Sequence, residues 1–139
     1  MLIALLTIAA SLAAPLPLDG YEAVRVALVA DQQAAAAAAA TALAGQLSEP
    51  AAAQAANAVA AATSLDAMRL AFGELSRAYV LHLDGTQKVY AYFCPMTAAW
   101  GYWLQPAAGI GNPYMGQSMP KCGEGVALRV ATKAAATTP

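Results

Sequence analysis

Charged residues are scarce in this sequence. Of its 139 residues, Lys and Arg together account for 7 and Asp and Glu for 8, so the formal net charge is −1. Binding to nucleic acid requires clustered Lys and Arg that neutralise phosphates, and attachment to anionic lipid requires a cationic helix. The composition therefore argues against nucleic acid and against an anionic membrane surface as partners.

Histidine and cysteine are also rare, with one histidine, His82, and two cysteines, Cys94 and Cys122. The sequence has no glycine-rich phosphate loop, no Ser-His-Asp arrangement and no zinc-protease helix. Cys94 lacks a base that would activate it as a nucleophile unless His82 reaches it. We therefore expect a protein that is not an enzyme and has no catalytic residues.

Aromatic residues make up only 7% of a chain that is 60% hydrophobic. Alanine supplies most of the apolar count, so the core is expected to be thin and made by few large side chains. The length suits one domain with one modest core.

Residues 1–14 form an apolar run that ends in small residues before Pro15. The run is shorter than the roughly 20 residues of a membrane span and has the length of a signal-peptide core. Ser11 and Ala13 supply small side chains where a signal peptidase reads them, although no Lys or Arg precedes the run. A buried first helix is the alternative. We predict a signal peptide over 1–14, a periplasmic or secreted mature protein, and no stable membrane insertion after cleavage.

Apolar periodicity predicts helices after the leader. A stripe begins at Tyr21 and resumes at Leu43 and Leu47, on both sides of an alanine run at 34–40, which predicts one long helix. A low-complexity linker is the alternative interpretation of that run. Ser48 is placed to cap a second helix that ends at about Ala62.

The clearest helical pattern follows a cap signal at Ser64. Apolar positions there alternate by three and four, so they share one face with the only histidine. The positions are Leu65, Met68, Phe72, Leu75, Tyr79 and His82.

The remainder of the chain is predicted to be less regular. Residues 88–93 resemble a strand, residues 100–104 a short helical piece, and residues 126–130 a second strand able to pair with the first. We predict a mainly α fold: an antiparallel, alanine-rich bundle of three to four helices with a short strand pair and an irregular Cys/Met cap. The domain would span 19–127 and a flexible tail 128–139.

Four sulfur side chains approach one another in this irregular segment. Cys94 and Met96 lie at its start, and Met119 and Cys122 lie near its end. Two cysteines in an exported protein can close a disulfide, which would stabilise the fold by about 3 kcal/mol. Thiolates and thioethers together can instead bind a soft ion such as Cu(I). His82 is either a core residue or an additional nitrogen ligand.

Several short motifs together resemble the bacterial DUF3347 family of exported domains found beside copper and heavy-metal efflux components. The motifs are Ala67 to Ser76, Cys94-Pro95-Met96, Trp103-Leu104, Asn112-Pro113-Tyr114-Met115-Gly116, and Met119 with Cys122-Gly123-Glu124. The resemblance implies a helical periplasmic domain that binds copper and works with an efflux component.

The chain departs from the family pattern in three places, one of which is the short loop after Met96 with Thr97-Ala98-Ala99 where relatives tend to be polar. Many relatives carry a histidine where this chain has Phe93, so His82 would have to replace that nitrogen ligand. Met115 stands where the family usually has an aromatic residue, so it is not carried over as a ligand. The expected function is periplasmic copper binding, as Cu(I), through Cys94, Met96, Met119 and Cys122 and optionally His82. The alternative is a disulfide-stapled helical interaction module without metal.

Overall fold

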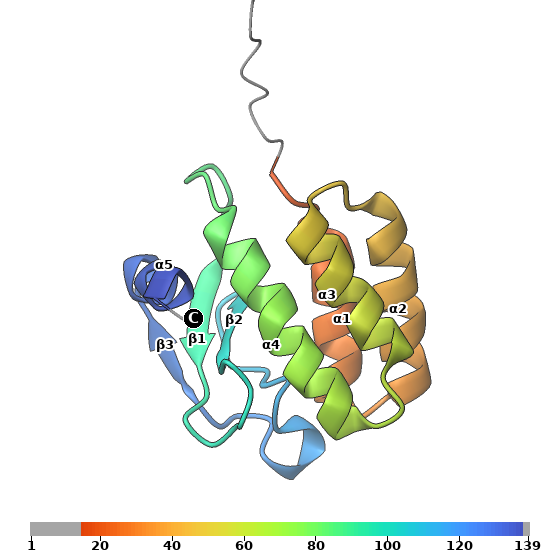
Figure 1. Cartoon of the computed structure of the whole chain (residues 1–139). Helices are drawn as coiled ribbons and strands as arrows, with labels where there is room; N and C mark the ends of the chain where they lie inside the picture. Colours follow the sequence, from red (N-terminus) through yellow and green to blue (C-terminus); the bar gives the residue numbers. More distant parts are fainter. Residues whose placement is uncertain (1–14, 138–139) are drawn as a thin grey trace, which may run out of the picture.

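The computed structural model describes residues 15–137, so the predicted signal peptide lies outside the described residues. Those residues form five α-helices and one three-stranded antiparallel sheet (Figure 1). The predicted mainly helical class is confirmed. The helices are α1 Leu18–Val29, α2 Gln33–Gln46, α3 Pro50–Ala61, α4 Leu65–Leu81 and α5 Leu128–Thr137, and the strands are β1 Tyr90–Phe93, β2 Tyr102–Gln105 and β3 Glu124–Val126. Within 15–137 no helix is long and apolar enough to cross a membrane.

The first helical segment is broken, so the prediction of one long helix is wrong. The chain leaves α1 at Val29 and enters α2 at Gln33. Between them Asp31 adopts the left-handed conformation, with φ of 56°. Asp is among the few residues that tolerate this region, and the Asp31 carboxylate forms an ion pair of 2.6 Å with Arg69 on α4. A tertiary contact therefore fixes a turn that the alanine run conceals.

The caps of α3 and α4 differ in how well the sequence predicted them. The carboxylate of Glu49 accepts hydrogen bonds from the backbone N–H groups of Ala51 and Ala52, so Glu49 caps α3 and the predicted cap at Ser48 is wrong. At α4 the predicted cap is confirmed, because Ser64 Oγ accepts a bond of 3.1 Å from the backbone N–H of Ala67.

Helix α4 is the central element of the fold. Helices α1 to α3 lie on one side of it, and the sheet with α5 lies on the other (Figure 1). Its predicted stripe is largely confirmed, since Met68, Phe72, Leu75 and Tyr79 are each at most 2% exposed. The ring of Tyr21 on α1 stacks on Phe72 with 5.1 Å between ring centroids. The few large aromatic side chains thus gather around this helix.

The sheet has the order β2-β1-β3. Strand β2 occupies the segment where a short helical piece was predicted, and that prediction is wrong. Gly101, with φ of 88°, turns the chain back so that Tyr102 lies opposite Phe93 and Trp103 opposite Tyr92. The Tyr92 and Trp103 rings stack at 5.4 Å. Cross-strand aromatic pairs of this kind stabilise a sheet and outweigh the weak local preference of so short a segment.

The C-terminal residues form a strand and a helix. Strand β3 pairs with β1, as predicted, but occupies Glu124–Val126, earlier than the predicted 126–130. The flexible tail predicted for 128–139 is corrected over 128–137, which form α5. Ala131 and Ala135 are both 0% exposed, so their small side chains let α5 lie close to its neighbours. The Nε–H of Arg77 donates a hydrogen bond of 3.0 Å to the backbone oxygen of Ala135.

The outer edge of β2 is closed by tyrosine hydroxyls. The backbone N–H of Leu104 donates to the hydroxyl of Tyr21 at 3.1 Å, and the hydroxyl of Tyr114 donates to the backbone oxygen of Tyr102. The Tyr21 hydroxyl also lies 2.7 Å from Ser76 Oγ on α4. These bonds satisfy backbone groups that a sheet edge otherwise leaves open, and they tie the sheet to the helices.

Gly116→Ala is expected to destabilise the protein by about 2 kcal/mol or more. Gly116 has φ of 57°, and a Cβ there would collide with the Asp31 carboxylate and the Arg69 guanidinium. Urea unfolding followed by circular dichroism measures the change. Gly85→Ala is the matched control, because Gly85 also has a positive φ but faces open space. Equal losses from the two variants would contradict the proposed crowding of the ion pair.

Candidate metal centre

The two cysteines lie at the same end of the sheet. Cys94 follows the last residue of β1 and is 1% exposed, whereas Cys122 is partly exposed and lies two residues before β3. Phe93 pairs with Glu124 at the end of the β1–β3 ladder, so both cysteines lie just beyond the last pair of that ladder. Both thiols are free, so no disulfide joins them in this structure.

Asn112 holds the segment that carries Cys122. Its side chain is 0% exposed, and its Nδ2 donates a hydrogen bond of 2.9 Å to the backbone oxygen of Cys122. Its Oδ1 accepts hydrogen bonds from the backbone N–H groups of Tyr114, at 2.8 Å, and Met115, at 3.1 Å. Its own N–H donates to the backbone oxygen of Pro120 at 2.8 Å. The motif that begins at Asn112 is thus a structural clamp, a role the sequence analysis did not assign.

The thioethers are more exposed than the thiols. Met119 is 38% exposed, and its backbone oxygen accepts a hydrogen bond of 3.2 Å from the N–H of Cys122, so the two residues share one turn. Met96 is 64% exposed and lines a cavity together with Met115. Met119 therefore lies in the same turn as Cys122, whereas Met96 lines a separate cavity.

His82 lies away from the cysteines. It caps the C-terminal end of α4, and its Nδ1 is 2.7 Å from the backbone oxygen of Ala78. The loop after Cys94 instead packs near Gly73, where a Cβ would meet the backbone N of Trp100 at 3.0 Å. The nine residues from Gly73 to His82 span about 13 Å along the helix. Figure 1 shows the end of α4 and the end of β1 at opposite ends of the molecule. The proximity expected for His82 and Cys94 is not found.

The ring of Tyr114 lies near the buried thiol of Cys94. Trp103 is 0% exposed and packs edge-on against Tyr114, with 6.0 Å between ring centroids. Burial raises the pKa of Tyr114 well above its usual value, and the nearby Cys94 contributes to that rise. Trp103 lies within the sheet, opposite Tyr92 of β1. Cys94 is 1% exposed, so the packed residues around it keep solvent from this thiol.

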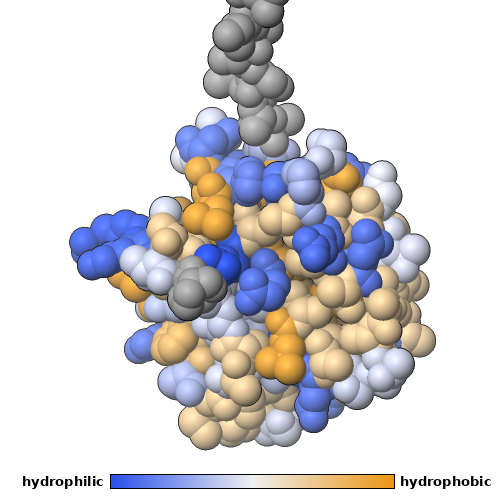
Figure 2. Space-filling view, in the orientation of Figure 1, coloured by the Kyte–Doolittle hydropathy of each residue, from blue (hydrophilic) through white to orange (hydrophobic). Residues whose placement is uncertain are grey.

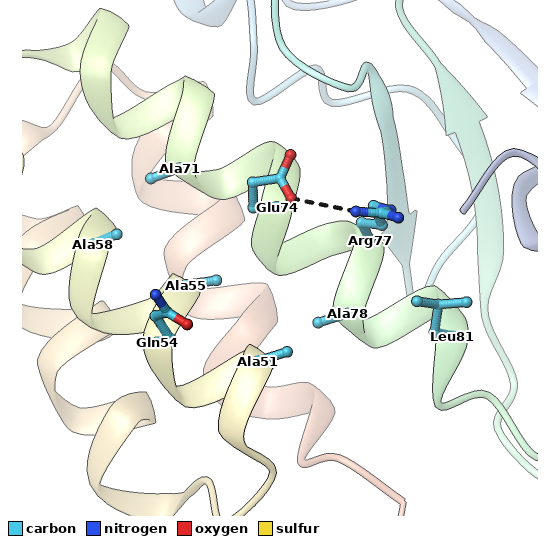
Figure 3. A pocket seen from close by; sticks show the side chains of 9 residues that line it. All are labelled: Ala51, Gln54, Ala55, Ala58, Ala71, Glu74, Arg77, Ala78 and Leu81. Carbon is cyan, nitrogen blue, oxygen red and sulfur yellow. Dashed lines mark ion pairs between the residues drawn. The ribbon is translucent and has the colours of Figure 1, made fainter. Parts of the chain in front are cut away.

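A separate groove lies between α3 and α4. It encloses about 330 Å³ and is lined mainly by alanines, with Gln54, Glu74, Arg77 and Leu81 around it (Figure 3). Glu74 and Arg77 form a 3.8 Å ion pair at its rim. Pale orange, weakly apolar residues cover much of the face over α2 and α3 (Figure 2). Arg77 also donates a hydrogen bond to the backbone oxygen of Ala135, so the charged side chains at the groove interact with the protein's own chain.

The described residues do not form a metal site from His, Cys and carboxylate side chains. Across residues 15–137, no group of three or more His, Cys, Asp or Glu side chains is placed to hold a metal ion. A metal at Cys94 and Cys122 would have to complete its shell with thioethers. No family model, curated protein or solved structure matches the chain. The resemblance to DUF3347 therefore stays a prediction.

Proposed function

We propose that this chain is an exported, periplasmic copper-binding protein. It holds Cu(I) at the sheet end through Cys94, Cys122 and Met119, and it buffers the ion or hands it to an efflux component. The helices around α4 serve as the scaffold of an antiparallel bundle, and the irregular Cys/Met segment serves as its functional cap. His82 is left out of the ligand set because of its distance from the cysteines.

The β1–β3 register carries the proposal. The segments that carry Cys94 and Cys122 lie at the same end of the sheet although 27 residues separate the two cysteines in the sequence, which supports a shared site. The Asn112 clamp fixes the backbone of Cys122, which reduces the conformational entropy lost when an ion binds. Exposed Met119 beside Cys122 gives an ion a path from solvent.

The donor chemistry favours copper over zinc. Thiolate and thioether are soft ligands that suit Cu(I), whereas zinc sites are built from Cys, His and carboxylate. The sulfur set offers two thiols and one adjacent thioether, with Met96 two residues from Cys94. When bound, the ion would take thiolates, so the thiols release their protons to solvent. Binding is therefore expected to weaken as the pH falls.

Cys94→Ser or Cys122→Ser is expected to lower Cu(I) affinity by about a hundredfold or more, and Met119→Leu by about tenfold. Competition of the reduced protein with a colorimetric Cu(I) chelator measures the affinity. His82→Ala and Met68→Leu are the controls, since His82 lies outside the site and Met68 is buried in the core. Unchanged Cu(I) affinity in both cysteine variants would show that the two cysteines do not bind the ion.

A disulfide-stapled interaction module without metal is the competing function, because the chain's two cysteines lie at the same end of the sheet. Titration of free thiols in protein purified from the periplasm, without reductant, separates the two functions. Two titratable thiols and copper in the metal analysis support the proposal. No titratable thiol and no metal support the staple.

A further inference from the structure

A second cavity adjoins the proposed copper site and contains two more thioethers. It encloses about 400 Å³ between the N-terminal half of α4, the loop after Cys94, and the segment around Met115. The side chains that define it are Asp66, Arg69, Leu70, Met96, Tyr114 and Met115. Met96 and Met115 thus reach the same space from two different segments of the chain.

The two methionines differ from an ordinary core methionine. Met68 is 1% exposed and fills the core, whereas Met96 is 64% exposed, an unfavourable position for a long apolar side chain without a partner. Met115 is partly buried, and its backbone is fixed by hydrogen bonds from its N–H to Asn112 Oδ1, at 3.1 Å, and from Ser118 Oγ to its oxygen, at 2.7 Å. The Met115 side chain therefore extends from a fixed backbone, whereas the exposed Met96 side chain is free to move onto an ion.

The charges around the cavity favour a cation. The guanidinium of Arg69 is neutralised by Asp31 at 2.6 Å and donates to the backbone oxygens of Pro113 and Leu28. Among the residues that the structure describes, Asp66, in the first turn of α4, forms no ion pair, so it adds one negative charge to the cavity. Two soft thioethers beside one negative charge suit a soft monovalent cation.

We propose that Met96 and Met115 form a second, weaker Cu(I) site in this cavity, with Asp66 supplying charge. The inference rests on the proposed function, because the ion then passes to the thiols of Cys94 and Cys122. Tyr114 lines the cavity and lies close to Cys94, which makes the two places neighbours. The transfer leaves copper as Cu(I): thioether bonds break, thiolate bonds form, and the thiol protons go to solvent.

Cu(I) titration of the reduced protein against a chelator tests this site. The wild-type chain is expected to bind about two ions, one tightly and one weakly. Met96→Leu with Met115→Leu is expected to lose the weak ion and keep the tight one. Met68→Leu, the matched control, is expected to bind as the wild type. A double Leu variant with wild-type stoichiometry and affinities overturns the proposal.

Cys94→Ser with Cys122→Ser separates this inference from the proposed function. If both hold, this variant keeps only the weak ion, and adding the two Leu substitutions removes it. If the cysteines do not bind copper, the Ser variant binds as the wild type, and the Leu substitutions still remove the ion held in the cavity. If the Leu substitutions remove nothing in the Ser background, the methionine site is excluded.

Discussion

Above about pH 10, the free energy of unfolding is expected to fall steeply, because three buried tyrosines keep their protons in the folded chain. Tyr21, Tyr79 and Tyr114 are at most 4% exposed, and burial raises the pKa of each hydroxyl above its ordinary value. All three hydroxyls are hydrogen-bonded, that of Tyr79 to the backbone oxygen of Pro17 at 2.6 Å. Ionisation in place would leave a buried phenolate.

The direction and size of the effect follow from linkage. The unfolded chain releases these protons near pH 10 and the folded chain does not, so the stabilisation is complete below about pH 10. It is lost as the pH rises toward the folded-state pKa values, by about 1.4 kcal/mol per pH unit for each tyrosine. Three tyrosines give about 4 kcal/mol per pH unit. A domain of ordinary stability would then unfold within about one to three pH units above 10.

Urea unfolding at a series of alkaline pH values measures the slope, and tyrosinate absorbance shows when the rings ionise. Tyr79→Phe should reduce the slope by about a third, because one buried hydroxyl is gone. Tyr90→Phe, at a half-exposed position outside the core, is the matched control. Ionisation of all six tyrosines before the helical signal is lost would contradict the expectation.

Asn112→Ala is expected to destabilise the protein by about 4 kcal/mol. The substitution removes the bonds to the backbone of Tyr114, Met115 and Cys122 and leaves three groups in a buried region without partners. Each such group costs about 1–3 kcal/mol. Because the clamp also positions Cys122, Cu(I) affinity should fall in the same variant. Thermal unfolding and the chelator competition measure the two effects.

Asn57→Ala is the matched control, since Asn57 is exposed on α3 and alanine has the better helix propensity. Its effect should stay within about 0.5 kcal/mol. Asn112→Asp offers a second check, because it keeps the two acceptor bonds and loses the donor to Cys122. Its stability should improve as the pH falls, since the protonated carboxyl regains a donor. A mild loss in Asn112→Ala would show that the clamp is not needed.

The sequence predicted the elements that depend on local periodicity and missed those that depend on distant contacts. The stripe of α4 was identified because four of its residues face one core. The turn at Asp31 was missed because its partner, Arg69, lies on another helix. Strand β2 was missed because it is only four residues long and owes its form to pairing with β1. Helix α5 was missed because Val126 and Val130 favoured a strand and the small and polar residues after them favoured a flexible tail.

The candidate site shows the same division. The grouping of Cys94 with Cys122 was predicted from the two sulfur motifs, and the pairing of β1 with β3 puts the two segments at the same end of the sheet. The position of His82 was not predictable, because periodicity gives the face of a helix and not which end meets the next strand. The role of Asn112 was hidden because an Asn-Pro pair looks like an ordinary turn. Only a count of its buried hydrogen bonds reveals the clamp.

The tyrosine hydroxyls that close the edge of β2 also bear on the order in which the fold can form during synthesis. Tyr21 and its backbone partner Leu104 are 83 residues apart, and Arg25 of α1 donates at 2.8 Å to the backbone oxygen of Gly111, 86 residues away. A nascent chain that has made all four N-terminal helices still lacks these partners. Final closure must wait for the last quarter of the polypeptide, which leaves the growing chain open for most of its translation.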